Sequence, residues 1–396
     1  MPSILFYCNR FYNFTGGLDV IMLFLNYLKQ NNKSVYLCPI LKNIPSLHIT
    51  TQLNDIPLDN LRQQDLNNFF NDLNVPGLCS DKTSINLIDT SLIVPINILK
   101  KKDNIIIYFE NVIGNPSMQK YVVRWLLFFP LPHEIRYYNF NTEYICFFSD
   151  YIFNFYKHIC MILNIPDLLT ENINNPKILR ILKFNKNLFN NIQKTPNNNS
   201  SFTIRKFFPP VSFRNITNAI NVKYIKEIKL NILNKIYFMK KQNTISYTNT
   251  KKLIKKYKSR VTRDDVIVHV KNKYKNYGFD ELLNIESTEK YIEYFKNKNY
   301  FISFDLFTFT SIIASLCGCI SVVKPIDGID FETWISLDPL NKYGVAYGNK
   351  TINHAINTRH LLLEHVNNTY MQNENNVINF IYDIESFFNI KIDNII

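Results

Sequence analysis

The sequence predicts an α/β protein with parallel, doubly wound sheets, and three observations support this class. Apolar strand-like segments alternate with helical segments up to about residue 163. The alternation restarts after a polar segment at Asn190–Ser201, which reads as a linker between domains. A strand, a turn, a helix and a second strand then follow one another within residues 300–323. Alternation of this kind is typical of parallel sheets, so we expect two α/β halves.

In the first half, short runs rich in Ile, Val, Phe and Tyr predict strands, and the longer stretches between them predict helices. The strands are expected at Ile4–Cys8, Ser34–Pro39, Ser84–Ile88, Asn104–Phe109 and Tyr144–Phe148. The helices are expected at Leu18–Gln30, Thr90–Leu99, Met118–Phe128 and Tyr151–Leu163. Gly114 and Pro116 precede the third helix and Pro130 follows it, as expected of residues that interrupt regular structure.

In the second half, strands are expected at Phe202–Phe207, Val266–Val270, Tyr300–Phe304 and Ile320–Val323, and helices at Thr288–Lys296, Ser311–Cys317 and over most of Ile352–Ile396. Residues 306–323 carry no charge, which raises the alternative of a membrane span. Their serines and threonines, a glycine near the end and the β-branched flanks favour a buried helix followed by a buried parallel strand.

Composition bounds the class of protein. The chain has 396 residues, of which 46% are hydrophobic, so it has ample material for a large core. Its seven cysteines are odd in number and lie mostly in apolar segments, which fits free thiols in a reducing compartment. The N-terminus lacks the charged region of a signal peptide. We therefore expect a soluble, cytoplasmic protein, and the host cytoplasm if the chain is viral.

The net charge is +13, and much of it lies between Lys235 and Lys275. The simplest interpretation of this basic stretch is a solvated face. Contact with an anionic membrane or a phosphorylated glycan is the next candidate. Nucleic acid is not expected as a partner, because no nucleic-acid-binding motif accompanies the charge.

Two segments have the chemistry of a phosphate site. A helix that begins just after a strand presents unpaired N–H groups and a positive dipole end, which suit a phosphate. Thr308, Thr310 and Ser311 add hydroxyl groups there, and Asp305 supplies an acceptor for sugar hydroxyls. An ordinary βαβ core unit explains the same pattern equally well. Gly16-Gly17 precedes the first helix, where the backbone must approach closely or turn sharply, but its spacing is not the dinucleotide fingerprint.

Together, the two α/β halves, Gly16-Gly17 and segment 301–323 resemble glycosyltransferases of the GT-B fold that carry a Glu-x7-Glu signature. Asp305 stands at the first acidic position of that signature, and Ala314 and Gly318 match the first and last residues of its Ala-x-Ala-x-Gly end. The second acid, which usually holds the nucleotide ribose in the family, is replaced by Ile313. Donor recognition here is therefore expected to be different or impaired.

Other segments resemble a bacterial and giant-virus branch of sugar transferases, and they occur in the same order along the chain. They are Glu110 with Gly114-Asn115-Pro116, then Val122–Leu127, Arg205-Lys206 and Lys342–Gly348. The resemblance implies two Rossmann-like domains that face each other across a cleft. Residues 1–195 would form the acceptor side and 202–348 the nucleotide-sugar side, with a basic insertion at about 211–260 and a helical tail, 349–396, that packs back on the first domain.

The activity implied by the resemblance is sugar transfer from a nucleotide sugar to a glycan, a lipid-linked glycan or a protein. The nucleotide sugar is a co-substrate, and no metal or other cofactor is expected. Adjacent Asp264-Asp265 does not change this, because neighbouring carboxylates on a strand diverge. A relative with this fold that binds without turnover is the first alternative, prompted by Ile313. A basic nucleic-acid-binding protein is the weaker one.

The resemblance and the strand ends together nominate site residues. Arg205 and Lys206 suit the leaving diphosphate, although an exposed pair at a strand end is the plain alternative. Glu110 follows a predicted strand and is the first candidate for the base that activates the acceptor hydroxyl. Asp19 and His133 compete for that role, although helix-dipole complementation and capping account for them without a function.

Two further expectations concern the residues around this base. Arg124, placed in the predicted helix Met118–Phe128, requires a partner, either Glu110 or a ligand phosphate. The aromatic run Phe128–Tyr138 either lines the acceptor side or belongs to the core.

Overall fold

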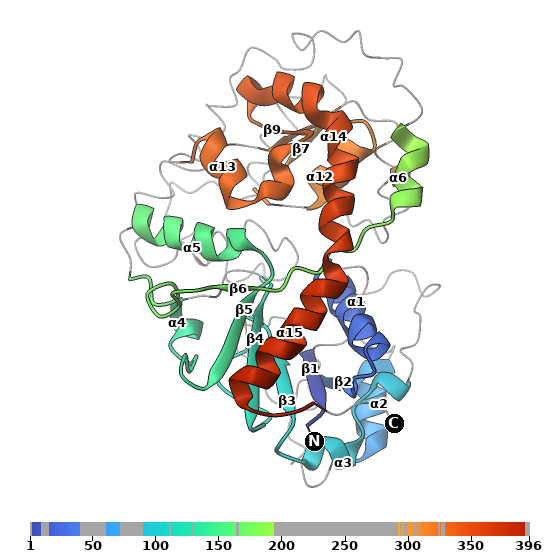
Figure 1. The fold of residues 1–396 in the computed structure, drawn as a ribbon, viewed down its shortest axis with the longest axis vertical. Coiled ribbons are helices and arrows are strands. Elements are labelled where there is room, and N and C mark those ends of the chain that lie inside the picture. The colour runs from blue at the N-terminus through green and yellow to red at the C-terminus, as the bar shows by residue number, and fades with distance from the viewer. Residues whose placement is uncertain are drawn as a thin grey trace, which may run out of the picture. The chain divides into compact units, whose positions relative to one another are not determined.

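The computed structural model describes residues 2–8, 16–39, 61–71, 90–110, 112–127, 130, 132–163, 166–193, 292, 293, 295, 300–303, 306, 307, 309–323, 325 and 329–392. The chain divides into two compact units (Figure 1). Unit 1 comprises Met1–Lys157, Asp167–Lys183 and Tyr370–Ile396, and unit 2 comprises His158–Pro166 and Phe184–Thr369.

Unit 1 is built on a parallel sheet of six strands in the order β2-β1-β3-β4-β5-β6. The strands are β1 (Ile4–Cys8), β2 (Val35–Pro39), β3 (Ile105–Tyr108), β4 (Tyr121–Leu126), β5 (Glu143–Phe147) and β6 (Lys177–Ile178). All residues of β1, β3 and β5 are buried, as expected for parallel strands that are covered on both faces. The α/β class and the parallel sheet predicted from the sequence are thereby confirmed.

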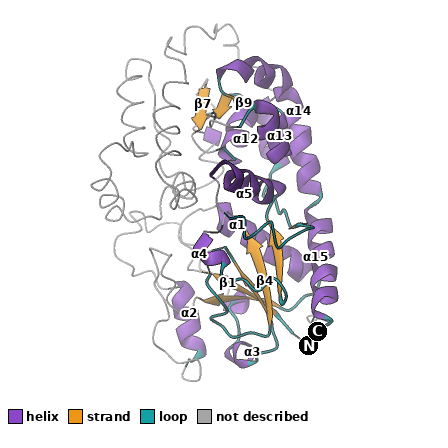
Figure 2. Cartoon of the chain, turned by 90° about the vertical axis from the view of Figure 1, so that its left-hand side faces the viewer, coloured by secondary structure: helices purple, strands orange, loops and turns teal. Residues whose placement is uncertain are grey.

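The helices of unit 1 come from the start of the chain and from its C-terminal part. They are α1 (Gly16–Gln30), α2 (Gln63–Asn71), α3 (Ile96–Lys100), α4 (Pro132–Ile135), the first part of α5 (Asp150–Leu163) and α15 (Asn373–Phe388), together with the short 3₁₀ helix η2 (Thr90–Leu92). Figure 2 shows α15 running along one side of the strands.

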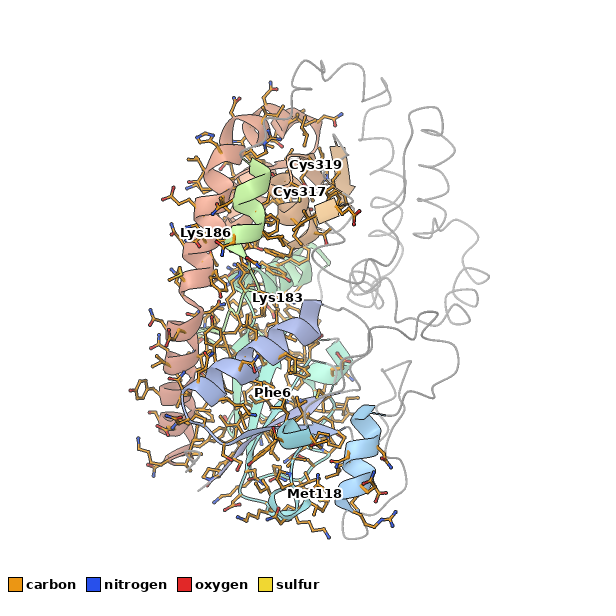
Figure 3. All side chains as sticks on the ribbon, turned by 90° about the vertical axis from the view of Figure 1, so that its right-hand side faces the viewer. Phe6, Met118, Lys183, Lys186, Cys317 and Cys319 are labelled. Carbon is orange, nitrogen blue, oxygen red and sulfur yellow. The ribbon has the colours of Figure 1, made fainter. Side chains whose placement is uncertain are left out.

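One face of the sheet is closed by an aromatic cluster shared between helices and strands. The Phe24 ring of α1 meets the rings of Trp125 on β4 and Phe380 on α15, with centroids 5.0 and 5.2 Å away. Phe24 also meets Phe6 on β1, which lies in the interior of the unit (Figure 3). Trp125 donates its indole N–H to the Leu179 carbonyl at 3.0 Å, which satisfies the one polar group of this cluster.

The opposite face carries the connection between β3 and β4, residues 109–120. Tyr108 and Arg124 are register partners on these two strands, so their side chains point to the same face. The Tyr108 hydroxyl donates to Asn115 Oδ1 at 2.8 Å, and the Ser117 N–H donates to the Tyr108 oxygen at 3.1 Å. Met118 adopts a left-handed backbone conformation, with φ of 53°, as this connection turns back toward β4.

Unit 2 contains a parallel sheet of three strands, β7 (Tyr300–Ser303), β8 (Ile320–Val323) and β9 (Val345–Tyr347), in that order. Its helices are the end of α5, α6 (Lys186–Gln193), α12 (Phe309–Leu316), α13 (Phe331–Leu337) and α14 (Ile352–Met371), with the 3₁₀ helices η5 (Pro339–Lys342) and η6 (Asn349–Thr351). α14 continues to Met371, although unit 2 ends at Thr369. Helix α12 connects β7 to β8, so these three elements form a βαβ unit.

The helix predicted at Met118–Phe128 is wrong, because this segment contains the buried central strand β4. An apolar run of this length fits either element, and here Val122, Val123 and Trp125 fit a strand that pairs on both sides. The linker predicted from Asn190 also needs correction, since α6 extends to Gln193. The C-terminal part is helical, as expected for most of Ile352–Ile396, and α14 lies in unit 2 up to Thr369 whereas α15 belongs to unit 1.

Smaller differences concern the ends of elements. Helix α1 begins at Gly16 rather than Leu18, so the two glycines form its first turn. The helix predicted over Thr90–Leu99 is a 3₁₀ turn followed by the short α3. The strands expected at Ser84–Ile88, Phe202–Phe207 and Val266–Val270, the basic stretch Lys235–Lys275 and most of the helix Thr288–Lys296 lie outside the described residues. Of the helices that are described, none has the length and hydrophobicity required to cross a bilayer.

Candidate functional site

The strand order places a topological switch point between β1 and β3. From β1 the chain passes to β2 on one side, and it then crosses to β3 on the other side. In open parallel sheets, ligands bind beyond the carboxyl ends of the strands at such a point. Here Gly16-Gly17, at the start of α1, follows β1, and Glu110 follows β3. The fold therefore brings these two predicted features to the same edge of the sheet.

Glu110 lies two residues beyond the end of β3 and is buried, with only 3% of its surface exposed. Its backbone carbonyl accepts a hydrogen bond of 2.8 Å from the hydroxyl of Tyr138, which is also buried. This contact fixes the backbone of Glu110 against the segment that follows α4. The backbone that carries this carboxylate is thus held by the sheet on one side and by Tyr138 on the other.

Buried charge is concentrated around Tyr138. Burial raises the pKa of the Tyr138 phenol; Arg124 opposes this shift, and the carboxylates of Glu134, Glu110 and Glu143 reinforce it. The four charged side chains are themselves buried. Several charged side chains are thus buried around one phenol, an arrangement that is costly in a core and is more typical of functional sites.

Arg124 is paired with Glu143 on the neighbouring strand β5. Arg124 Nε donates to Glu143 Oε2, and one of its terminal nitrogens donates to Glu143 Oε1 at 3.0 Å. The expectation that Arg124 pairs with Glu110 or with a ligand phosphate therefore needs correction. On a strand, Arg124 faces the diagonal residue of the next strand, whereas on a helix it would have faced the preceding turn.

The same guanidinium also fixes the connection that follows Glu110. It donates to the carbonyls of Val112 and Gly114 at 2.7 and 2.8 Å, and it lies over the Tyr138 ring at 4.2 Å from the centroid. Every nitrogen of the fork therefore has an acceptor, as a buried arginine requires. Arg124 is therefore a structural clamp that joins β5 to the residues just after Glu110.

Three of these residues were not expected from the sequence as parts of a site. Tyr138 is predicted only as part of an aromatic run, and the sequence does not single out Glu134 or Glu143. No local pattern identifies them, because they meet only when β3, β4 and β5 pair in order. Within the described residues, no group of three or more His, Cys, Asp or Glu side chains is arranged to hold a metal ion.

The second candidate region is the start of α12 in unit 2. Thr310 is partly exposed in the first turn, whereas the side chain of Ser311 is completely buried. Within the described part of the chain, no hydrogen-bond partner meets Ser311 Oγ. A buried hydroxyl without a partner is unusual, and here it lies in the turn whose backbone N–H groups are also unsatisfied within the helix.

The loop that enters α12 is held by aromatic packing. Trp334 of α13 donates its indole N–H to the Leu306 carbonyl at 3.0 Å, and its ring stacks on Tyr347 at the end of β9, with centroids 4.9 Å apart. Ile313, which stands at the position of the missing second acid, is buried in α12. This helix therefore presents no carboxylate at that position and contributes an apolar side chain to the core.

Several predicted site residues lie outside the described part of the chain. They are Arg205, Lys206, Asp305 and Thr308, together with Asp264-Asp265. Asp19 and His133 are placed only by their backbones, in the first turn of α1 and in α4, and their side chains are not among those described.

Comparisons with known proteins give this chain no relatives. No protein-family model, no curated protein and no solved structure matches it.

Proposed function

We propose that the protein is a nucleotide-sugar-dependent glycosyltransferase with a GT-B arrangement, in which unit 1 binds the acceptor and unit 2 binds the donor. The observation that supports this most is the difference between the two parallel sheets. A buried carboxylate, Glu110, follows the switch-point strand of unit 1, and an uncharged, hydroxyl-bearing helix start follows β7 in unit 2. One region suits proton removal from a hydroxyl, and the other suits an anionic leaving group.

On the donor side, the diphosphate of the nucleotide sugar would lie at the start of α12. Backbone N–H groups, the dipole end and the hydroxyls of Thr310 and Ser311 would stabilise the charge that develops as the sugar–phosphate bond breaks. This assignment gives Ser311 Oγ an acceptor. Asp305 and Thr308 belong to the same proposal, as do Arg205 and Lys206, which would add the positive charge that the described helix start lacks.

On the acceptor side, Glu110 would take the proton from the attacking hydroxyl. The acceptor oxygen forms a bond to the sugar carbon while the bond from that carbon to the diphosphate oxygen breaks, so the leaving group departs as the nucleoside diphosphate. This in-line step inverts the configuration at the sugar carbon. Asp19 and His133 remain the competing candidates for the base, and Gly16-Gly17 would allow close approach of the donor or acceptor to α1. The acceptor would be a glycan, a lipid-linked glycan or a protein.

A binding protein of the same fold without turnover is the second candidate, and Ile313 favours it. In the family that the sequence resembles, the acid at this position usually holds the nucleotide ribose. A buried isoleucine has no group that binds a ribose hydroxyl, so the nucleotide would be held through its phosphates and base alone.

A panel of nucleotide sugars separates the two candidates. The full chain is incubated with each donor and a mixture of glycan and glycolipid acceptors, and both binding and release of the nucleoside diphosphate are measured. Release that depends on the acceptor, and that is lost in Glu110→Gln, supports the transferase. Binding of a diphosphate without release for any donor supports the binding protein, and absence of binding contradicts both.

A further inference from the structure

Four lysines and an exposed methionine lie on two neighbouring chain segments at the amino-terminal edge of the unit 1 sheet. We call this group the edge surface and define it as Lys100, Lys101, Lys102, Met118 and Lys120. All five side chains are exposed. They lie at the opposite end of the strands from Glu110, since α3 precedes β3 and Lys120 precedes β4. Figure 3 shows Met118 at the outer margin of unit 1.

Hydrogen bonds join the two chain segments that form the edge surface. The Lys120 N–H donates to the Lys102 carbonyl at 2.7 Å, and Lys102 Nζ donates to the Ser117 carbonyl at 3.2 Å. Lys120 Nζ also lies over the Tyr121 ring, 5.0 Å from its centroid. These contacts hold the two lysine-bearing segments together. Asp103 is the one acidic residue within 100–103 and 117–120.

Met118 combines a strained backbone with a large apolar side chain that is exposed. Its backbone has φ of 53°, a region that glycine or asparagine adopts more readily, and 58% of the residue is exposed. A large apolar side chain there costs backbone strain and is only partly covered within unit 1. Strained positions of this kind persist where they serve a function. An apolar partner that covers the Met118 side chain would account for both its strained backbone and its exposure.

We propose that the edge surface docks on an anionic membrane, with Met118 inserted among the lipid acyl chains and the lysines against the headgroups. Lysine clusters bind anionic lipid surfaces through charge, and an apolar side chain at their centre adds insertion into the interface. The flexible, unbranched methionine suits a fluid apolar environment. The surface continues through Tyr121, whose ring meets Phe388 at 5.2 Å, to the exposed Phe387 of α15. This docking is independent of the reaction proposed above.

Flotation of the full chain with lipid vesicles tests the proposal. We expect binding to phosphatidylcholine vesicles that contain phosphatidylserine, weaker binding without phosphatidylserine, and loss of binding at high salt. The triple change Lys100→Gln, Lys101→Gln and Lys120→Gln is expected to weaken binding about a hundredfold, since each lysine near an anionic surface contributes about fivefold. Met118→Gly is expected to weaken it about three- to tenfold.

Matched control variants show whether vesicle binding depends on the edge surface or on the overall positive charge of the chain. Lys183→Gln, Lys186→Gln and Lys350→Gln remove the same charge from exposed positions elsewhere, and Met371→Ala removes a methionine that is 66% exposed. These variants are expected to bind as the wild type does. Met118→Gly relieves the left-handed strain, so it should be at least as stable in urea, and misfolding then cannot explain a loss of binding.

Three results would overturn the proposal. The first is that the edge-surface variants bind phosphatidylserine vesicles as tightly as their controls. The second is that the edge-surface variants and their controls lose vesicle binding equally, which would assign it to the overall charge or to Lys235–Lys275. The third is that the edge-surface variants lose only duplex nucleic-acid binding or self-association, which would assign the surface to one of those partners instead.

Discussion

The carboxyl ends of the two parallel sheets differ in charge. Beyond the strands of unit 1, buried glutamates gather around Tyr138, and a single buried arginine holds the backbone beside them. At the start of α12 in unit 2, the described side chains are uncharged, and the polar groups are hydroxyls and backbone N–H groups. Among the described residues, two sheets with the same parallel pairing thus place different polar groups at their carboxyl ends, namely buried carboxylates in unit 1 and uncharged hydroxyls in unit 2.

This difference shows that the strand pairing does not determine what the edge of a sheet does. In unit 1, Tyr138 and Arg124 hold the backbone of Glu110 and of the residues after it, so the base that we propose would be held rigidly. In unit 2 the start of α12 offers partial positive charge, so an anion is favoured there. The predictions below test this difference between the two units, and the one with the largest effect comes first.

Removing the charge of Glu110 is the most direct test of the buried carboxylates beyond the strands of unit 1. If Glu110 is the base, Glu110→Gln should lower kcat about 10²- to 10⁴-fold, because the amide cannot accept the proton. The dissociation constant of the donor, measured by calorimetry, should not change, since the donor is assigned to unit 2. Glu364→Gln, at an exposed glutamate of α14, is the control. Full activity in Glu110→Gln would move the role to Asp19 or His133.

Breaking the clamp beside Glu110 should destabilise unit 1. Arg124→Met leaves Glu143 without its cation and two carbonyls without donors, so we expect a loss of about 3–5 kcal/mol in the free energy of unfolding in urea. Arg136→Met, at an exposed arginine, should change it by less than about 0.5 kcal/mol.

A double variant tests whether the clamp is a coupled pair. Arg124→Met combined with Glu143→Leu should recover part of the loss, because no buried charge then lacks a counter-ion. If the two single losses simply add, the pair is not coupled and Arg124 acts mainly through the loop carbonyls.

Two buried serines of unit 2 provide a matched test of the proposed anion site at the start of α12. Ser311 and Ser321 are both fully buried, and neither hydroxyl has a partner in the described part of the chain, but only Ser311 lies in the first turn of α12. Ser311→Ala should weaken binding of a nucleoside diphosphate about tenfold, or about 1.4 kcal/mol, whereas Ser321→Ala should not. Equal affinities by calorimetry would exclude Ser311 from the site. Neither change should destabilise the fold, since no internal hydrogen bond is lost.

The smallest effect concerns pH and the attachment of α15 to unit 1. Burial raises the pKa of Glu385, but the Ile392 N–H, Lys391 and Lys33 lower it more, so the folded-state pKa lies below the ordinary value of 4.5. The unfolded chain therefore binds the proton first, and this stability is lost as pH falls from about 4.5 through the folded-state pKa.

Glu385→Gln is expected to lower the stability of unit 1 by about 1 kcal/mol at neutral pH and to flatten its decline in acid. Glu374→Gln, on the same helix but exposed, should keep the wild-type profile. Urea unfolding at a series of pH values measures both, and identical profiles for the wild type and Glu385→Gln would show that Glu385 does not contribute.

The sequence predicts the elements whose pattern is local. Helices α1 and α5 and strands β1, β3 and β8 all lie within a few residues of the predicted ranges, because periodicity and flanking residues decide them. Strand β4 was predicted as a helix, because the run from Met118 to Phe128 is mostly apolar and whether it forms a helix or a strand depends on pairing with β3 and β5. That one error also misassigned the partner of Arg124.

The residues of the candidate site also divide into those that a local pattern predicts and those that depend on strand pairing. Glu110 and the start of α12 were predicted, since each directly follows a strand. The cluster around Tyr138 was not, because Glu134 and Glu143 approach Glu110 only through the order of the strands. Contacts across a parallel sheet join residues far apart in sequence, and a single chain carries no local sign of them.

The return of α15 to unit 1 has a consequence for how the protein is made. Phe380, which completes the cluster with Phe24 and Trp125, is synthesised after all of unit 2. Chains generally begin to fold from the N-terminus during translation. The nascent six-stranded sheet must therefore wait, with one face incomplete, while the ribosome adds nearly two hundred further residues after Lys183. During that interval the cell must protect the exposed aromatic face, and chaperones that bind apolar surfaces are suited to do so.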